Sequence, residues 1–144
     1  MRSLEMDFDP VSHITTDAIG EPGKRVFYLQ ASHAERVVTL LVEKFQIQTL
    51  AIGVEQFLAE LSKKFPNLSP ASDQYVENQM HILPPVEPLF RVGELKMGYQ
   101  SERDRVILSA YELIGEESDP DDARVVRFWV SRSQLRAMCR WGLE

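Results

Sequence analysis

The stretch RVVTLLVEKFQIQTL, residues 36–50, returns in altered form as RVVRFWVSRSQLRAM, residues 124–138. The two stretches align without a gap, and identical Arg, Val and Gln residues stand at matching positions. In both, apolar residues first alternate with a period of two and then take the spacing of a helix, which predicts a strand followed by a helix. We therefore predict an internal duplication.

Further alternating segments, bounded by turn residues, precede each copy. In the first half they predict strands over residues 12–20, 25–31 and 36–44. A helix is predicted over 47–64, and Pro66 ends it. In the second half the same signals predict strands over 89–99, 104–114 and 123–130. The last helix is predicted over 131–144, with Ser131 as its N-cap.

The segment between the halves, residues 66–88, contains five prolines and no clear period, so we predict a long surface connection. One unit of three strands and a helix buries its apolar faces poorly, whereas two units bury them together. The predicted fold is α+β: two β-β-β-α units, about residues 11–65 and 89–144, form mainly antiparallel sheet with two helices about a pseudo-twofold axis. We expect residues 1–144 to form a single domain.

Composition restricts the classes of function. The chain has 144 residues, of which 44% are hydrophobic, and a formal net charge of -6, which makes nucleic acid an unlikely partner. No signal peptide and no membrane-spanning apolar run is evident, so we expect no membrane association. The single cysteine, Cys139, forms no intrachain disulfide and favours a cytoplasmic location. We expect no metal site and no cofactor, because the three histidines lack metal-ligand spacing.

Four motifs carry a resemblance to a known family: FDP at 8–10, GEPGKRVFYLQA at 20–31, LVEKFQIQTLA at 41–51 and FRVGELKMGY at 90–99. With these motifs the chain resembles the bacterial family named domain of unknown function 3090. The resemblance covers most of the chain and implies no activity. Members of that family usually continue into a cysteine- and histidine-containing tail that resembles a zinc ribbon. This sequence stops at Glu144. Either it is truncated before such a tail or this member lacks one, and the resemblance carries no zinc site over to its residues.

The turn GEPGKR, residues 20–25, and the strand-to-helix junction at 43–48 are the candidate ligand-binding segments. Glycine and proline suit a plain hairpin turn, whereas arginine and lysine side chains also suit a phosphate or carboxylate. A junction before a helix offers free N–H groups as well as side chains, although helix capping explains the same residues. The candidate ligand-binding residues are Glu21, Lys24, Arg25, Gln30, Glu43, Lys44 and Gln46.

A second set of candidates belongs to partner binding. Arg132, Arg136 and Arg140 recur every four residues and predict a basic ridge on the last helix. The ridge either binds an acidic partner, pairs with the acidic loop EESDPDD at 116–122, or is solvated. Trp129 is predicted on the strand face opposite the helices, as is Leu41 in the first half. That face is either covered by the connection or forms a dimer patch.

These patterns favour a cytosolic, non-enzymatic binding or adaptor module whose partner is an unknown protein or a small anionic ligand, with a homodimer as an open alternative. The other interpretation is an enzyme that acts on a small phosphorylated or carboxylated molecule in a groove between the two units. In that case Glu43 serves as the acid or base and Arg25 holds the anion. Catalytic residues are otherwise unknown, because Cys139 is expected in the core and no nucleophile–base set is evident.

Overall fold

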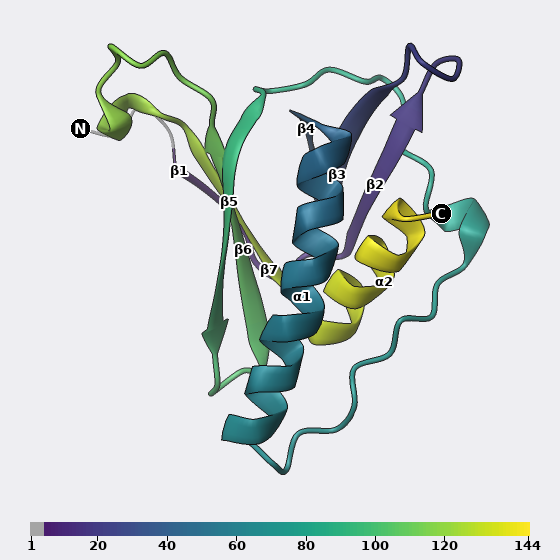
Figure 1. Ribbon diagram of the computed structural model, residues 1–144, viewed down its shortest axis with the longest axis vertical. Coiled ribbons are helices and arrows are strands. Elements are labelled where there is room, and N and C mark those ends of the chain that lie inside the picture. The colour runs from purple at the N-terminus through teal and green to yellow at the C-terminus, as the bar shows by residue number, and fades with distance from the viewer. Residues whose placement is uncertain (1–4) are drawn as a thin grey trace.

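The computed structural model describes residues 5–144, which form two sheets and two long helices (Figure 1). Sheet A has the strand order β1-β7-β6-β5, with β1 parallel to β7 and the other pairs antiparallel. Sheet B is antiparallel, with the order β2-β3-β4. The strands are β1 (Glu5–Phe8), β2 (His13–Ile19), β3 (Val26–His33), β4 (Arg36–Val42), β5 (Val92–Gln100), β6 (Arg105–Glu112) and β7 (Val125–Val130). The helices are α1 (Lys44–Lys64) and α2 (Arg132–Gly142), with short 3-10 turns at Glu77–Gln79 and Pro120–Asp122.

The predicted fold class is therefore confirmed, and the predicted elements lie near their observed bounds. The start of α1 differs, because the helix begins at Lys44 rather than at residue 47. Its first turn is largely exposed and carries no apolar period, so the sequence pattern begins one turn late. Strand β1 was not predicted, since four residues are too few to show an alternation.

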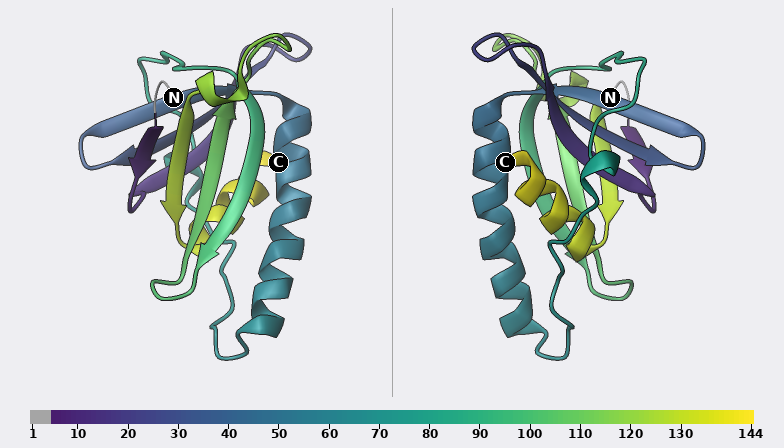
Figure 2. Two further views of the ribbon diagram at one scale, coloured as in Figure 1. Left: turned by 90° about the vertical axis from the view of Figure 1, so that its left-hand side faces the viewer. Right: turned by 90° about the vertical axis from the view of Figure 1, so that its right-hand side faces the viewer.

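One core joins both sheets and both helices. The bridge between Leu41 and Arg91 links the two sheets, and in the view of Figure 1 α1 and α2 lie in front, with sheet A to their left and β2 to their right. Figure 2 shows the same arrangement from the side, with α1 along the β5 margin of sheet A. The inward residues of the two repeated strands are buried, and they belong to the same cluster as buried residues of both helices: Val38, Leu40, Val42, Val126, Phe128, Val130, Val54 and Leu135.

Each half of the chain lends an extended segment to the other half. Strand β1 pairs in parallel with β7, where Phe8 lies opposite Phe128. In the same way, the segment before β5 lies parallel to β4, with a bridge between Leu41 and Arg91. The Leu41 N–H donates to the Phe90 carbonyl at 2.9 Å. Both outer strands, β7 and β4, therefore gain a neighbour from the opposite half.

The two helix starts are also held by equivalent glutamines. The side-chain oxygen of Gln46 accepts from the Glu43 N–H at 2.8 Å, and the side-chain oxygen of Gln134 accepts from the Ser131 N–H at 2.9 Å. Each side-chain NH2 group donates to a carbonyl of the other half: that of Gln46 to Val92 and that of Gln134 to Val11, both at 3.0 Å. Ser131 is the N-cap of α2, as predicted. The duplication itself stays a prediction.

The connection, residues 66–88, first runs along α2. Arg132 donates to the Ser69 carbonyl at 2.7 Å, and Arg136 donates to the Ala71 carbonyl at 2.8 Å. Four residues advance a helix by about 6 Å, and two residues of extended chain cover about 6.6 Å. Successive turns of α2 therefore meet every second residue of the connection.

The connection then covers the outer face of sheet B. The Thr15 hydroxyl donates to the Met80 carbonyl at 2.6 Å. Gln30 binds Leu83 in both directions, because its amide group donates to the Leu83 carbonyl at 3.0 Å and its oxygen accepts from the Leu83 N–H at 2.8 Å. The predicted cover over this face is present, and Leu41 is half-buried beside its end.

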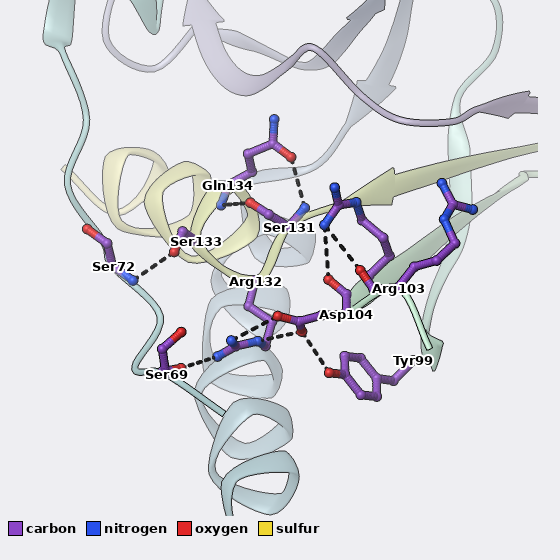
Figure 3. Close-up of polar contacts among 10 residues, drawn as sticks. Ser69, Ser72, Tyr99, Arg103, Asp104, Ser131, Arg132, Ser133 and Gln134 are labelled. Carbon is purple, nitrogen blue, oxygen red and sulfur yellow. Dashed lines mark hydrogen bonds and ion pairs between the residues drawn. The ribbon is translucent and has the colours of Figure 1, made fainter. Parts of the chain in front are cut away.

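Arg132 anchors a polar cluster where α2 begins (Figure 3). Its guanidinium binds both carboxylate oxygens of Asp104, at 2.8 and 3.0 Å, while Arg132 itself is only 8% exposed. The Tyr99 hydroxyl donates to the same carboxylate at 2.7 Å. Asp104 has a φ of 49°, a conformation that Asp tolerates better than most residues. The cluster thus ties the β5–β6 turn, α2 and the connection together.

Replacing Arg132 should destabilise the fold more than replacing an arginine without an acidic partner. We expect Arg132→Gln to lower the free energy of unfolding by about 2 kcal/mol, because it removes charge-assisted hydrogen bonds from a nearly buried group. Arg105, which donates only to backbone carbonyls, is the matched control, and Arg105→Gln should cost within about 0.5 kcal/mol. Urea unfolding measures both values. If both variants lost the same free energy of unfolding, the hydrogen bonds between Arg132 and Asp104 would not be what stabilises this part of the fold.

The same cluster predicts a dependence of stability on pH. The hydrogen bonds from Arg132 hold the pKa of Asp104 below its ordinary value. A carboxyl whose pKa is lowered on folding stabilises the protein above its unfolded-state pKa, about 3.9, and that contribution is lost as the pH falls through the folded-state pKa. Between pH 6 and pH 3, Asp104→Asn should therefore lose less stability than the natural chain. Urea unfolding at each pH tests this, with Asp121→Asn, on an exposed turn, as the variant that should follow the natural chain.

Candidate functional site

A groove of about 360 Å³ lies between the β2–β3 turn, the first turn of α1 and the C-terminal end of α2. We call it the turn groove. Two of its walls, α2 and β2, lie close together, since a Cβ atom on Gly142 would lie 2.7 Å from the Thr16 methyl group. The residues that line the turn groove are Thr16, Asp17, Ala18, Gly20, Arg25, Phe27, Lys44, Ile47, His81, Trp141, Gly142, Leu143 and Glu144.

A second hollow, of about 380 Å³, is lined in part by the same basic side chains. Its walls are Pro22, Gly23, Arg25, Phe27 and Lys44, so it contains two cations and no acidic residue. Arg25, Phe27 and Lys44 are common to both hollows. Two of the predicted ligand-binding residues, far apart in sequence, are thus brought together.

Arg25 differs from the other arginines in residues 5–144, because its guanidinium has no ion pair, hydrogen bond or ring contact there. The others are held: Arg36 lies over Phe8, Arg105 binds backbone carbonyls, and the rest form ion pairs. The ammonium of Lys44 likewise has no acidic partner in this part of the chain. Two like charges side by side repel each other, and an anion between them removes that repulsion.

The turn itself is explained by hairpin geometry. Gly20 and Gly23 have φ values of 116° and 85°, which glycine adopts without strain. The Lys24 N–H donates to the Glu21 carbonyl at 2.9 Å and closes the turn. The side chains of Glu21 and Lys24 are exposed and line neither hollow. The turn therefore places Arg25 at the groove.

The remaining predicted ligand-binding residues have structural contacts. Gln30 is buried and holds the connection, and Gln46 joins the start of α1 to β5. The Glu43 carboxylate pairs with Arg91 at 2.6 Å. None of these three lines the turn groove.

The predicted basic ridge on α2 is occupied by contacts within the chain. Arg132 pairs with Asp104, Arg136 with Glu55, and Arg140 with Asp73 and Glu144. We considered the acidic loop at 116–122 as the partner of the ridge, but these three arginines form their ion pairs with carboxylates elsewhere in the chain. Arg136 in addition holds the connection, so the ridge acts in packing.

Trp129 alternates on β7 with the buried Phe128 and Val130, so it lies on the opposite, outer face of sheet A. The helices do not cover that face (Figure 1). Its indole N–H donates to Asp7 at 2.9 Å, and the Arg103 guanidinium lies 5.5 Å from its ring. Hydrogen bonds from Arg127 and Trp129 hold the pKa of Asp7 below its usual value, with Arg127 the stronger. Trp129 is therefore part of a polar network on that face.

Several groove residues were not predicted from the sequence. His81 binds Asp17 at 3.1 Å and meets the Trp141 ring at a right angle, 5.2 Å between centroids. The Trp141 indole donates to the Thr16 carbonyl at 2.7 Å. Their spacing in sequence gives no signal, because the connection brings His81 to the groove from outside both halves.

The described residues offer little for covalent or metal chemistry. Burial raises the pKa of the Cys139 thiol to about 12, so the thiolate is scarce at neutral pH. Within residues 5–144 no group of three or more His, Cys, Asp or Glu side chains gathers around a possible metal position. In the same range no helix is both long and apolar enough to cross a bilayer.

Comparison with known proteins gives a family and no activity. The sequence profile of a family described as protein of unknown function, DUF3090, matches residues 6–144. A curated human relative, the cation channel sperm-associated targeting subunit tau, is 33% identical over 76 residues, which make up 52% of this chain and 4% of that protein. No solved structure matches significantly. Since the family profile spans nearly the whole chain, the protein belongs to the DUF3090 family.

Proposed function

We propose that this protein is a binding module that holds a small anionic group, a phosphate or a carboxylate, between Arg25 and Lys44. The observation that carries the proposal is the contrast among the arginines: the Arg25 guanidinium has no partner in the described chain, whereas its counterparts are held. A planar guanidinium binds such oxygens through two parallel hydrogen bonds, and the ammonium adds a third donor group.

The surroundings support an anion. The second hollow offers two cations, the Phe27 ring and a glycine-rich turn, with no carboxylate in its walls. In the turn groove, Asp17 is already satisfied by the N–H groups of Ala18 and Ile82 and by His81. The other acid of the turn groove, Glu144, is paired with Arg140 and accepts from the Tyr75 hydroxyl.

The proposal stops at binding. Glu43, which we considered as an acid or base, is paired with Arg91 and lies outside the groove. No other observation favours catalysis over binding. A cytoplasmic location is part of the proposal, and the single, buried cysteine supports it.

Titration of the 15N-labelled protein with inorganic pyrophosphate, at constant ionic strength, tests the site. We expect the largest amide shifts at the turn of residues 20–25 and at the start of α1. Arg25→Gln and Lys44→Gln should each weaken binding by about tenfold or more, the effect of losing one charge-assisted hydrogen bond.

Lys24→Gln is the matched control, because it removes the same charge from the adjacent residue, whose side chain lines neither hollow. It should leave the affinity within about threefold. If Lys24→Gln lost as much affinity as Arg25→Gln and Lys44→Gln, pyrophosphate would be held only by general electrostatic attraction and not by a defined site. Absence of shifts at the groove would refute the site itself.

A further inference from the structure

Another groove lies at the β4 edge of sheet B, where residues 89–91 leave the start of β4 uncovered. It measures about 610 Å³, and we call it the β4 groove. Its walls are mainly apolar, and Val37 and Leu83 at its rim are 52% and 61% exposed. The lining residues are Met6, Phe8, Arg36, Val37, Val38, Thr39, Leu83, Pro84, Pro85, Glu87, Pro88 and Leu89.

The backbone of β4 faces this groove with unused hydrogen-bonding groups. The β3–β4 hairpin closes with His33 opposite Arg36, so every second residue from Arg36 directs its peptide groups to β3. Val37 and Thr39 direct theirs outward. The Thr39 carbonyl accepts from the Leu89 N–H at 2.8 Å, whereas the N–H and C=O of Val37 have no partner in residues 5–144.

The other half of the chain shows what fits beside such a strand. In the alignment of the two repeated stretches, Val37 corresponds to Val125, and β1 covers Val125 by pairing it with Glu5. On β4, the segment from Leu89 onward supplies the same kind of cover only from Thr39 onward. The register that joins the Leu89 N–H to the Thr39 carbonyl would place the Glu87 N–H at the Val37 carbonyl. Within residues 5–144, however, no hydrogen bond joins residues 84–88 to Val37.

We propose that the β4 groove binds an extended peptide segment of a partner protein as an added parallel strand. The added strand continues the ladder that residues 89–91 already form with β4 and uses the free N–H and C=O of Val37. Backbone hydrogen bonds supply affinity in this mode of recognition, and alternate side chains supply specificity. Alternate apolar side chains of the segment would reach Phe8 and Val38, as Met6 and Phe8 of β1 reach the core.

The ladder on β4 identifies the occupant as an extended chain. An apolar small molecule would fill the groove but leave the Val37 backbone unpaired. Figure 2 shows that the β3–β4 hairpin reaches away from the helices, so neither α1 nor α2 lies over its tip. A partner segment can therefore approach along β4 without displacing a helix.

A synthetic peptide with the sequence EMDFD, that of residues 5–9, is a suitable probe because β1 already adopts the required conformation. We expect it to shift the amide signals of Val37 and Thr39 in the 15N-labelled protein. Two N-methylated peptides carry the decisive test. Methyl groups on the amides that face β4 should weaken binding by about tenfold or more, and methyl groups on the alternate amides should weaken it far less.

Variants of β4 give a second, independent test. The Val37 N–H points away from β3, so Val37→Pro removes the outward donor without breaking a hydrogen bond inside sheet B. Val37→Pro should lose peptide binding by about tenfold or more, and Val37→Thr, which keeps the donor, should stay within about threefold. Melting curves establish that both variants are folded, and the methylated peptides test the natural protein if Val37→Pro is not.

Three results would overturn the proposal. Equal affinity of the two methylated peptides would mean apolar contact without strand pairing. Shifts confined to β7 would mean that the peptide replaces β1. An absence of shifts on β4 at millimolar peptide would mean that the edge accepts no added strand.

Discussion

The start of β5 beside the end of β4 is the constraint on which the rest of the structure depends. The bridge between Leu41 and Arg91 fixes it, and α1 leaves from the same place, at Lys44. A helix of 21 residues carries the chain about 32 Å away. The connection must therefore return over the whole length of α1 before β5 begins. A segment that crosses that much surface needs contacts of its own, since its ordering costs about 1–2 kcal/mol per residue in backbone entropy.

The arginines of α2 and the polar residues of sheet B supply those contacts. Arg132 and Arg136 bind carbonyls of the connection and are themselves fixed by carboxylates of the β5–β6 turn and of α1. Each guanidinium is held in place by a carboxylate, and its remaining N–H group is thereby positioned to donate to a carbonyl of the connection. Gln30 then holds Leu83 on sheet B. The arginines that the sequence suggested as a partner-binding surface thus have a structural role, because they hold the connection against α2.

The sequence predicts what depends on local periodicity and misses what depends on the returning chain. Strands β2 to β7 and the cap at Ser131 follow from alternation and from capping preferences, and the structure has them. Strand β1 has too few residues for an alternation, and its stability comes from β7, at the other end of the chain. The acids that meet the ridge arginines are far apart in sequence, so spacing does not identify them. In the site, Arg25 and Lys44 were found as candidates, whereas His81 reaches the groove only through the connection.

This division explains why the two proposed sites lie where they do. The arginines that stabilise the connection already donate to carboxylates and carbonyls within the chain. The strand edges beside a segment from the other half already have their backbone groups hydrogen-bonded to it. Two places in the first half stay open: the Arg25 guanidinium at the β2–β3 turn, and the backbone of Val37 near the tip of β4. Neither is needed to close the fold, since Arg25 has no partner in the described chain and Val37 is half exposed. Residues that fold stability does not require are free to carry binding, and we propose that in this protein they are the cations Arg25 and Lys44 and the strand edge at Val37.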